Sequence, residues 1–369
     1  MADEVLDRRA LNRALLARQL LLERSDVDVR SAVERLVGLQ GQSPAPPYYG
    51  LWSRIDGFDP GALGSMLTDR EAVRMTLMRG TIHLVTVDDA LTLRPLMQPA
   101  IDRAVSQLLR QLPNLDLAAA RAAPAEILAS EPLGARALAR RLVARGIDAD
   151  PVILGYAIPG FLPLVQLPPR GVWGEGGQVR YATLESWTGR ELDPDPSIDE
   201  LVLRYLRGFG PASVVDMQSW SGLTGLGEAF ERLRDRLVTF RNEDGRELFD
   251  LPGAPRPDPG TPAPVRFLGE YDNVLLGHRD RRRIVPEGFR WEEMLASGRF
   301  VNNLLVDGML RATWWIERDG RRRATLGVRP FGGLSAAERA EVAVEGDRIL
   351  DFAAADADRR EVGFEAPLG

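Results

Sequence analysis

The first part of the chain carries apolar residues at helical spacing, followed by two short alternating segments. The alternating segments flank Arg79-Gly80, which is typical of a β-hairpin. Three helices followed by a two-stranded wing are the pattern of a winged-helix unit. The helices are expected at 6–22, 29–39 and 60–67, and the strands at 73–78 and 81–86.

The same order of elements recurs twice without an exact sequence repeat. In the last unit, Asp244-Gly245 between two apolar runs is a strong hairpin signal. The expected helices lie near 88–111, 117–129, 134–145, 197–208, 211–221 and 225–236, and the expected strands within 162–182 and around 237–251. We therefore predict three tandem winged-helix units, at 1–87, 88–185 and 186–252.

The remainder of the chain changes character after a proline-rich and glycine-rich linker at 252–264. Beyond it, residues 265–369 are rich in strand patterns, with Asp-Gly pairs at 307–308 and 319–320 that indicate hairpins and one helix near 335–345. This pattern predicts a small C-terminal β-barrel or sandwich. The fold class is therefore predicted to be α+β.

Composition removes several kinds of chemistry. The 369 residues include no cysteine and only two histidines, and all 47 basic residues are arginine. Cysteine nucleophiles, thiolate metal sites, lysine Schiff bases and a P-loop lysine are excluded, and a histidine-rich metal centre is disfavoured. We expect neither a metal nor a cofactor. Every cationic contact is a planar guanidinium, which suits phosphate groups.

The net charge of −6 argues against a protein that coats nucleic acid indiscriminately, although a local basic groove is compatible with it. No apolar run reaches 18 residues, and the acidic start of the chain does not resemble a signal peptide. We expect a cytoplasmic protein without a membrane segment.

The most unusual segment is Gly38 to Trp52, which holds two glutamines and three prolines. Gly41 in a left-handed conformation and the prolines are expected to end the second helix here. At a helix end, the amides of Gln40 and Gln42 can converge on one spot. Alternatively, both side chains cap helix carbonyls or face solvent.

Several segments together resemble one family. Leu39-Gln-Gly-Gln-Ser-Pro, Arg74-Met-Thr-Leu-Met-Arg-Gly-Thr-Ile-His and Phe267-Leu-Gly-Glu-Tyr-Asp are similar to the AlkZ/YcaQ-type bacterial DNA glycosylases. The resemblance implies three winged-helix units and a C-terminal β-barrel around a concave DNA-binding face. It also implies a catalytic pair written Gln–aliphatic–Gln, which Gln40 and Gln42 match. Gly41 departs from the aliphatic middle position.

Two neutral amides suit one class of lesion. A purine alkylated at N7 is already cationic, so it leaves without protonation, and the enzyme has only to place a water and stabilise the developing sugar cation. We therefore expect a monomeric, monofunctional glycosylase that acts on N7-alkylated purines in double-stranded DNA. Bulky adducts and interstrand crosslinks are included, in repair or in self-resistance to an alkylating natural product.

Further candidates come from the arginine-rich segments and the aromatic residues. Arg281, Arg282 and Arg283, and Arg321, Arg322 and Arg323, are predicted to contact DNA, and Tyr48 and Tyr49 could stack on it. Trp52 is at least as well explained as a hydrophobic anchor. Asp272 and His278 could line the site, or could be structural hydrogen-bonding residues.

Two other functions are compatible with the same pattern. A non-catalytic winged-helix protein, such as a transcriptional regulator, would also bind DNA, but the retained Gln40 and Gln42 disfavour it. A damage-sensing scaffold with an inactive site would follow if Gly41 disrupts the pair.

Overall fold

The first part of the chain folds into helices around a hairpin. Three of these helices begin at an aspartate whose side chain accepts a hydrogen bond from a backbone N–H of the first turn, Asp7, Asp28 and Asp59. The elements are α1 (Arg8–Arg18), α2 (Val29–Arg35), β2 (Leu39–Gln40), α3 (Pro46–Trp52), α4 (Pro60–Thr68), β3 (Ala72–Thr76), the 3-10 turn η1 (Met78–Gly80) and β4 (Ile82–Thr86). The hairpin around Arg79-Gly80 is confirmed.

The second predicted helix is shorter than expected. It ends at Arg35, and Val37 and Gly38 take the left-handed conformation that the sequence assigned to Gly41. The reason is that Leu39 and Gln40 pair with β4 as a short strand, so the helix must stop and reverse before them.

The second and third units follow the predicted order with two additional helices, α8 and the short α9. Helix α8 escaped prediction because it is apolar almost throughout and contains Pro159. The elements are α5 (Val87–Leu109), α6 (Leu117–Ser130), α7 (Ala135–Ala144), α8 (Pro151–Phe161), β5 (Leu164–Gln166), β6 (Tyr181–Thr183), α9 (Leu184–Thr188), α10 (Ile198–Phe209), α11 (Val214–Ser221), α12 (Gly227–Arg232), η2 (Arg234–Arg236), β7 (Val238–Asn242) and β8 (Glu247–Asp250).

The three units share one topology. Each has a helix, a short extended segment, two more helices and a hairpin whose second strand pairs with that extended segment. The extended segment is β2 in the first unit, Leu133 bridged to Tyr181 in the second, and Ala212 bridged to Phe249 in the third. Strand β3 also pairs with β5, so one sheet of order β2-β4-β3-β5-β6 joins the first two units.

The C-terminal part is an open sheet, so the predicted closed barrel is wrong for the strands that the structure describes. Their order, β13-β12-β11-β10-β9, leaves β13 and β9 as edges. Helix α15 packs on β9, β12 and β13, so it covers the apolar face that a barrel would bury by closing. The elements are β9 (Arg266–Leu268), α13 (Asn273–Leu276), β10 (Asn302–Val306), β11 (Met309–Asp319), β12 (Arg323–Pro330), α15 (Ala336–Ala353) and β13 (Arg360–Phe364).

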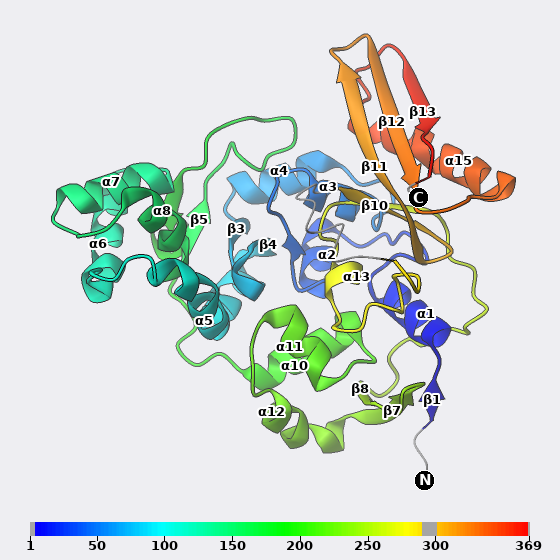
Figure 1. Cartoon of the computed structure of the whole chain (residues 1–369), viewed down its shortest axis with the longest axis horizontal. Coiled ribbons are helices and arrows are strands. Elements are labelled where there is room, and N and C mark those ends of the chain that lie inside the picture. The colour runs from blue at the N-terminus through cyan, green and yellow to red at the C-terminus, as the bar shows by residue number, and fades with distance from the viewer. Residues whose placement is uncertain (1–3, 290–300, 368–369) are drawn as a thin grey trace.

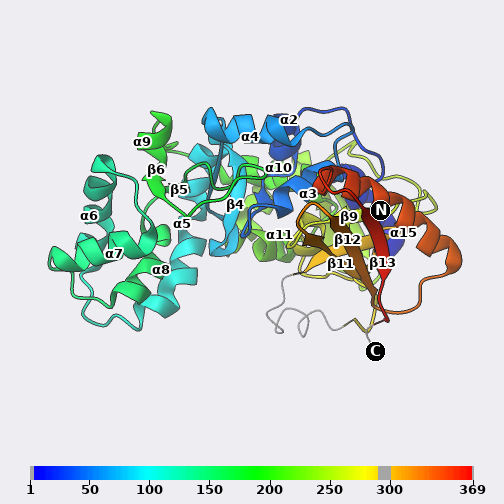
Figure 2. The ribbon, with the colours of Figure 1, turned by 90° about the horizontal axis from the view of Figure 1, so that it is seen from above.

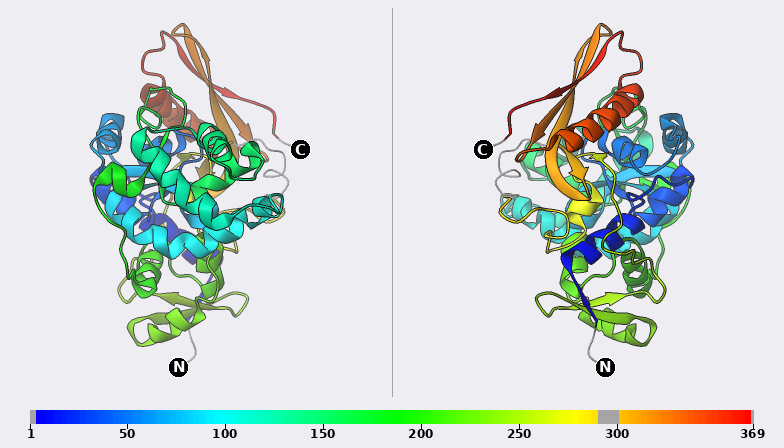
Figure 3. Two further views of the ribbon diagram at one scale, coloured as in Figure 1. Left: turned by 90° about the vertical axis from the view of Figure 1, so that its left-hand side faces the viewer. Right: turned by 90° about the vertical axis from the view of Figure 1, so that its right-hand side faces the viewer.

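The computed structural model describes residues 4–289 and 301–367. Helices α6–α8 lie at one end of the molecule and the C-terminal sheet with α15 at the other, with the first unit between them (Figures 1 and 2). The third unit lies at the base beside the N-terminus (Figure 3), where the strand β1 (Val5–Leu6) runs parallel to β7. The boundaries at 1–87, 88–185, 186–252 and 265–369 remain predictions.

The first unit packs on both neighbours. Its hairpin residues Met75 and Leu77 belong to a core shared with Trp220 of the third unit, whereas Leu39 and Tyr48 belong to a core shared with Trp314 of the C-terminal sheet. The β2–β4 region is therefore held between two hydrophobic cores. Among the described helices, none has the length and apolar character needed to cross a membrane.

Candidate active site

Gln40 is the last residue of β2, the short strand that pairs with β4 of the first unit's hairpin. It lies opposite His83 in the antiparallel register, and the next N–H, that of Gly41, donates to the carbonyl oxygen of Ile82 at 2.8 Å. Its side chain sits in a largely closed environment, since the residue is only 7% exposed. Gln40 is therefore placed by strand pairing and not, as the sequence suggested, by the end of a helix.

The amide of Gln40 is held by an arginine. Nη2 of Arg79 donates to Oε1 of Gln40 at 2.7 Å, and Nη1 of Arg79 donates to the carbonyl oxygen of Trp220. Burial, with a smaller contribution from the charge of Arg281, lowers the pKa of Arg79 to about 10. The guanidinium therefore stays protonated at neutral pH, and the two arginines stand close enough for their charges to interact.

Gln42 is more exposed, but it is tied to the same hairpin. Its Oε1 accepts a hydrogen bond from the backbone N–H of Ile82 at 3.1 Å. Both glutamines thus use one lone pair of the side-chain oxygen for a hydrogen bond to the hairpin, and neither NH₂ group has a hydrogen-bond partner among residues 4–289 and 301–367. The side-chain oxygens of both glutamines therefore accept hydrogen bonds from the same hairpin.

Gly41 is explained by a close neighbour. A Cβ atom at this position would lie 3.2 Å from Cγ of Pro47, so a larger side chain would require Pro47 to move. The carbonyl oxygen of Gly41 accepts a hydrogen bond from Nη2 of buried Arg74 at 2.7 Å. The backbone between the two glutamines is thereby fixed without an aliphatic residue.

Two titratable side chains lie beside these glutamines. Nδ1 of His83 lies 3.0 Å from the carbonyl oxygen of Thr81, and burial together with the charge of Arg79 lowers the pKa of His83 to about 3. His83 is therefore neutral near pH 7. Burial raises the pKa of the carboxyl of Glu270, which interacts with the side chain of Ser43, the residue after Gln42.

The aromatic residues after the glutamines are part of the core. Tyr48 is 1% exposed and donates its hydroxyl to the carbonyl oxygen of Gly171 at 2.8 Å, so it cannot stack on a base as predicted. Half-buried Tyr49 packs edge-on against Trp173 and Trp314. Trp52 stacks on Phe352, which confirms its reading as a hydrophobic anchor. Tyr49 and Trp52 therefore pack the first unit against the C-terminal sheet and its helix.

Asp272 and His278 are structural. Both carboxylate oxygens of Asp272 accept hydrogen bonds from Arg54, at 2.7 and 2.8 Å, and Asp272 also caps α13. Nε2 of His278 lies 2.9 Å from the carbonyl oxygen of Phe209, and burial lowers the pKa of this imidazole to about 3. The sequence allowed either a site-lining or a structural role for these two residues, and the structural role applies to both Asp272 and His278.

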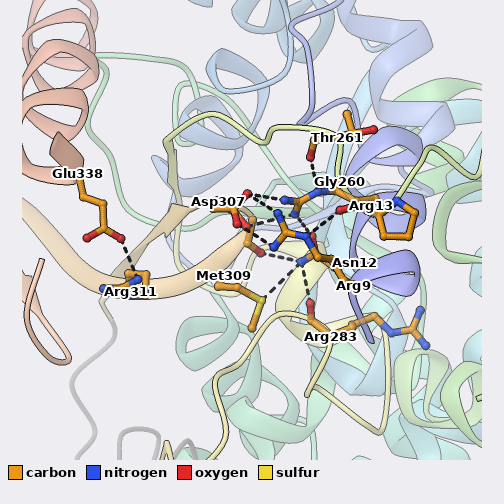
Figure 4. A network of polar contacts seen from close by, with 12 residues as sticks. Arg9, Asn12, Arg13, Gly260, Thr261, Arg283, Asp307, Met309, Arg311 and Glu338 are labelled. Carbon is orange, nitrogen blue, oxygen red and sulfur yellow. Dashed lines mark hydrogen bonds and ion pairs between the residues drawn. The ribbon is translucent and has the colours of Figure 1, made fainter. Parts of the chain in front are cut away.

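The arginines at 281–283 have three different environments. Arg283 is buried and donates from Nη1 to the carbonyl oxygen of Pro211 at 3.0 Å, while its own carbonyl accepts from Asn12 (Figure 4), so it is not a surface contact. Arg282 forms ion pairs with Asp244 and Asp280. Arg281 donates a hydrogen bond to the carbonyl oxygen of Leu275, and its positive charge contributes to the lowered pKa of Arg79.

The second arginine cluster is exposed. Arg321 and Arg322 lie in the turn between β11 and β12, and Arg323 begins β12. All three residues are exposed, and the side chain of Arg322 is 86% exposed, with a long ion pair of 3.7 Å to Asp319. This turn is available to a phosphate backbone.

Sequence reasoning missed two arginines that hold the site. Arg74 and Arg79 both lie in the motif around the hairpin, but nothing in their spacing shows that one reaches Gly41 and the other Gln40. The sequence signal was their position in the predicted hairpin, Arg74 on its first strand and Arg79 in its turn.

The comparisons with known proteins now decide the family. Residues 33–352 match the family described as DNA glycosylase AlkZ-like, which is most of the chain. The chain belongs to the AlkZ-like DNA glycosylase family. As an AlkZ-like DNA glycosylase, it is a hydrolase of N-glycosyl bonds and its substrate is DNA.

Two comparisons, one with a curated sequence and one with a solved structure, both from Streptomyces sahachiroi, extend this result. The AlkZ-like chain is 25% identical over 330 residues to an "Interstrand DNA cross-link repair glycosylase", covering 82% of this chain and 85% of that protein. It also superposes on the solved structure of the DNA glycosylase AlkZ with a TM-score of 0.71 and 21% identity, over 98% of this chain and all of that one. The superposition shows that the two share a fold.

Proposed function

We propose that this AlkZ-like glycosylase hydrolyses the N-glycosidic bond of cationic N7-alkylated purines in duplex DNA, with Gln40 and Gln42 as its catalytic pair. The observation that carries the proposal is the anchoring of both neutral amides on one hairpin, while their NH₂ groups have no hydrogen-bond partner within the part of the chain that the structure describes. Held amides need no reorganisation when charge develops in the transition state.

The groups beside Gln40 explain the choice of lesion. Neutral His83 and permanently protonated Arg79 cannot protonate a leaving base near pH 7. An undamaged purine therefore leaves poorly, whereas an N7-alkylated purine departs as a neutral molecule. The absence of lysine from the chain supports a monofunctional enzyme without lyase activity.

The natural lesion is proposed to include crosslinks. The curated relative is named for interstrand crosslink repair, and the similarity covers most of both chains. We propose that this protein also removes bulky adducts and unhooks crosslinks, in repair or in self-resistance to an alkylating natural product. We expect it to act as a monomer, and in the cytoplasm because its substrate is genomic DNA.

We further propose that the three units are winged helices arranged around a concave DNA-binding face. In support, each unit has the order helix, extended segment, helix, helix, hairpin. The second strand of the hairpin lies between its first strand and the extended segment. That arrangement is typical of a helix-turn-helix core with a wing.

The test of this function is base release. Purified protein should liberate 7-methylguanine from methylated duplex DNA and leave undamaged guanine in place, as measured by chromatography of the released bases. A crosslinked duplex should in addition be separated into single strands. Release of undamaged guanine with a rate that falls as Glu270 ionises would contradict the proposal, because it would reveal an acid catalyst. Tight binding to one sequence without any release would instead favour a regulator.

The exposed turn at 321–323 is proposed to contact the phosphate backbone together with Arg281. Replacing Arg321, Arg322 and Arg323 by glutamine should weaken binding to DNA of any sequence and reduce the slope of log K against log salt by about 1–3, since each phosphate contact contributes ~0.9. Fluorescence anisotropy over a salt series measures this. Arg145→Gln, at an arginine paired with Glu126, is the control and should change neither quantity. An unchanged slope in the triple variant would remove this turn from the interface.

A further inference from the structure

Arg79, at the tip of the first hairpin, is half-buried and points into the molecule. Arg79 has a positive φ of 56°, a left-handed backbone conformation that is unfavourable for a residue with a side chain. In a winged-helix unit the tip of the wing is an exposed loop, but here burial depresses the pKa of Arg79. The side chain is turned inward, toward Gln40.

The tip is clamped between two neighbouring helices. A Cβ atom on Gly80 would lie 2.5 Å from Cβ of Ala104 in α5, and a Cβ atom on Gly222, after α11, would lie 3.1 Å from Cα of Arg79. Such close approach leaves the backbone of the tip little freedom to move. From this backbone position the guanidinium donates to both Gln40 and Trp220.

This contact decides the orientation of an amide. A guanidinium has only donors, so the group of Gln40 that faces Arg79 must be its oxygen, and the NH₂ group points away from Arg79. Without that contact, the amide could rotate by half a turn at little cost and present its oxygen instead. Hydrogen bonding to a cation also polarises the amide, which makes its NH₂ group a stronger donor.

The charge of Arg79 has no carboxylate partner within the described residues. It donates to an amide oxygen and to a backbone carbonyl, which satisfy hydrogen bonds but leave the positive charge of this half-buried side chain uncompensated. Stability alone favours an apolar side chain in such a place. The arginine is thus explained by what it does to Gln40.

We propose that Arg79 is a positioning residue that makes Gln40 a hydrogen-bond donor toward the DNA, an inference that rests on the proposed catalytic role of Gln40. Gln40 then binds an oxygen of water or of the sugar–phosphate backbone through its NH₂ group. It does not face the developing sugar cation with its carbonyl.

The decisive variant is Gln40→Glu, because a carboxylate accepts the hydrogen bond from Arg79 and pairs with its charge but has no NH₂ group to donate. This variant should fold at least as stably as the wild type and yet release 7-methylguanine as slowly as Gln40→Ala. Single-turnover rates on methylated duplex DNA and thermal unfolding measure the two quantities. If Gln40→Glu keeps a rate within threefold of the wild type, Gln40 acts as an acceptor and the inference is overturned.

The role of Arg79 itself is tested by a double-mutant cycle. Arg79→Met should reduce the single-turnover rate at least tenfold with the dissociation constant for DNA unchanged within twofold, and should cause no further loss in a Gln40→Ala background. Arg103→Met is the matched control, since Arg103 donates to the carbonyl oxygen of Gly222 in the same turn without touching Gln40, and its rate should stay at the wild-type value.

The outcomes separate the inference from the proposed function. If Gln40→Ala retains full activity, the catalytic role of Gln40 is wrong. If Gln40→Ala is inactive but Arg79→Met is fully active, or lowers the residual rate of Gln40→Ala as much as it lowers that of the wild type, only the positioning role fails. Should Arg79→Met not fold, the result with Gln40→Glu decides alone.

Discussion

Alanine in place of Gln40 or Gln42 is expected to lower the rate of release of 7-methylguanine about 100-fold to 1,000-fold in single-turnover experiments. The physical reason is that each amide is already held on the hairpin, by Arg79 or by the N–H of Ile82, so its remaining hydrogen-bonding groups meet the transition state without reorganisation. In enzymes that catalyse acyl transfer, removal of one preorganised hydrogen-bond donor typically lowers the rate by a factor of about 100 to 1,000.

Gln218→Ala is the matched control for this prediction. Its Oε1 accepts a hydrogen bond from the backbone N–H of Leu226 at 3.2 Å, as Gln42 does from Ile82, but it lies on α11. The control should release base at the wild-type rate. Equal rates for all three alanine variants would show that the proposed pair is not catalytic, provided that thermal unfolding shows each variant to be folded.

Asparagine in place of Asp272 is expected to lower the free energy of unfolding by about 3–5 kcal/mol, because it leaves the charge of Arg54 buried without a partner. The side chains of this pair are 0% and 2% exposed, and both oxygens of the carboxylate are used. Asparagine keeps an oxygen that can cap α13, so the change isolates the charge. Denaturant titration followed by circular dichroism measures the effect.

Two further variants make this result specific. Arg54→Met combined with Asp272→Leu removes both charges and should recover much of the lost stability. Glu365→Gln, in the half-exposed ion pair with Arg329, should cost less than about 1 kcal/mol. If Asp272→Asn instead abolished base release with stability unchanged, Asp272 would belong to the active site after all.

Elements with local signals were predictable. Asp28 caps α2 and Asp59 caps α4 through their own side chains, and Arg79-Gly80 and Asp244-Gly245 mark turns between apolar runs. These signals involve residues a few positions apart, so they act before any tertiary contact forms. The hairpins and most helices of the three units therefore follow from the sequence.

Elements that depend on distant partners were missed. Strand β2 exists because Leu39 and Gln40 pair with Leu84 and His83, more than 40 positions away. The C-terminal sheet stays open in the described residues because α15 covers one face, and an apolar alternation in the strands is the same whether a helix or another strand buries it. Pattern alone cannot choose between these partners.

The candidate site divides in the same way. Gln40 and Gln42 could be singled out because two amides around a glycine are unusual and matched a family pattern. Tyr48 and Arg283 were misjudged, since an aromatic ring or a guanidinium has the same sequence signal on a surface as in a core. Burial depends on which elements pack together, and that information is not local.

The sequence by itself therefore determined the residue types available for chemistry, arginine cations and neutral amides without lysine or cysteine, and the local turns and caps that shape each unit. Only the tertiary structure decided which of the 47 basic residues serve the site. It buries Arg283 and Arg54 in structural contacts, brings Arg79 to Gln40, and leaves the turn at 321–323 exposed. The physical reason is that a guanidinium's role is set by its desolvation and by its partners, both of which come from segments far apart in the chain.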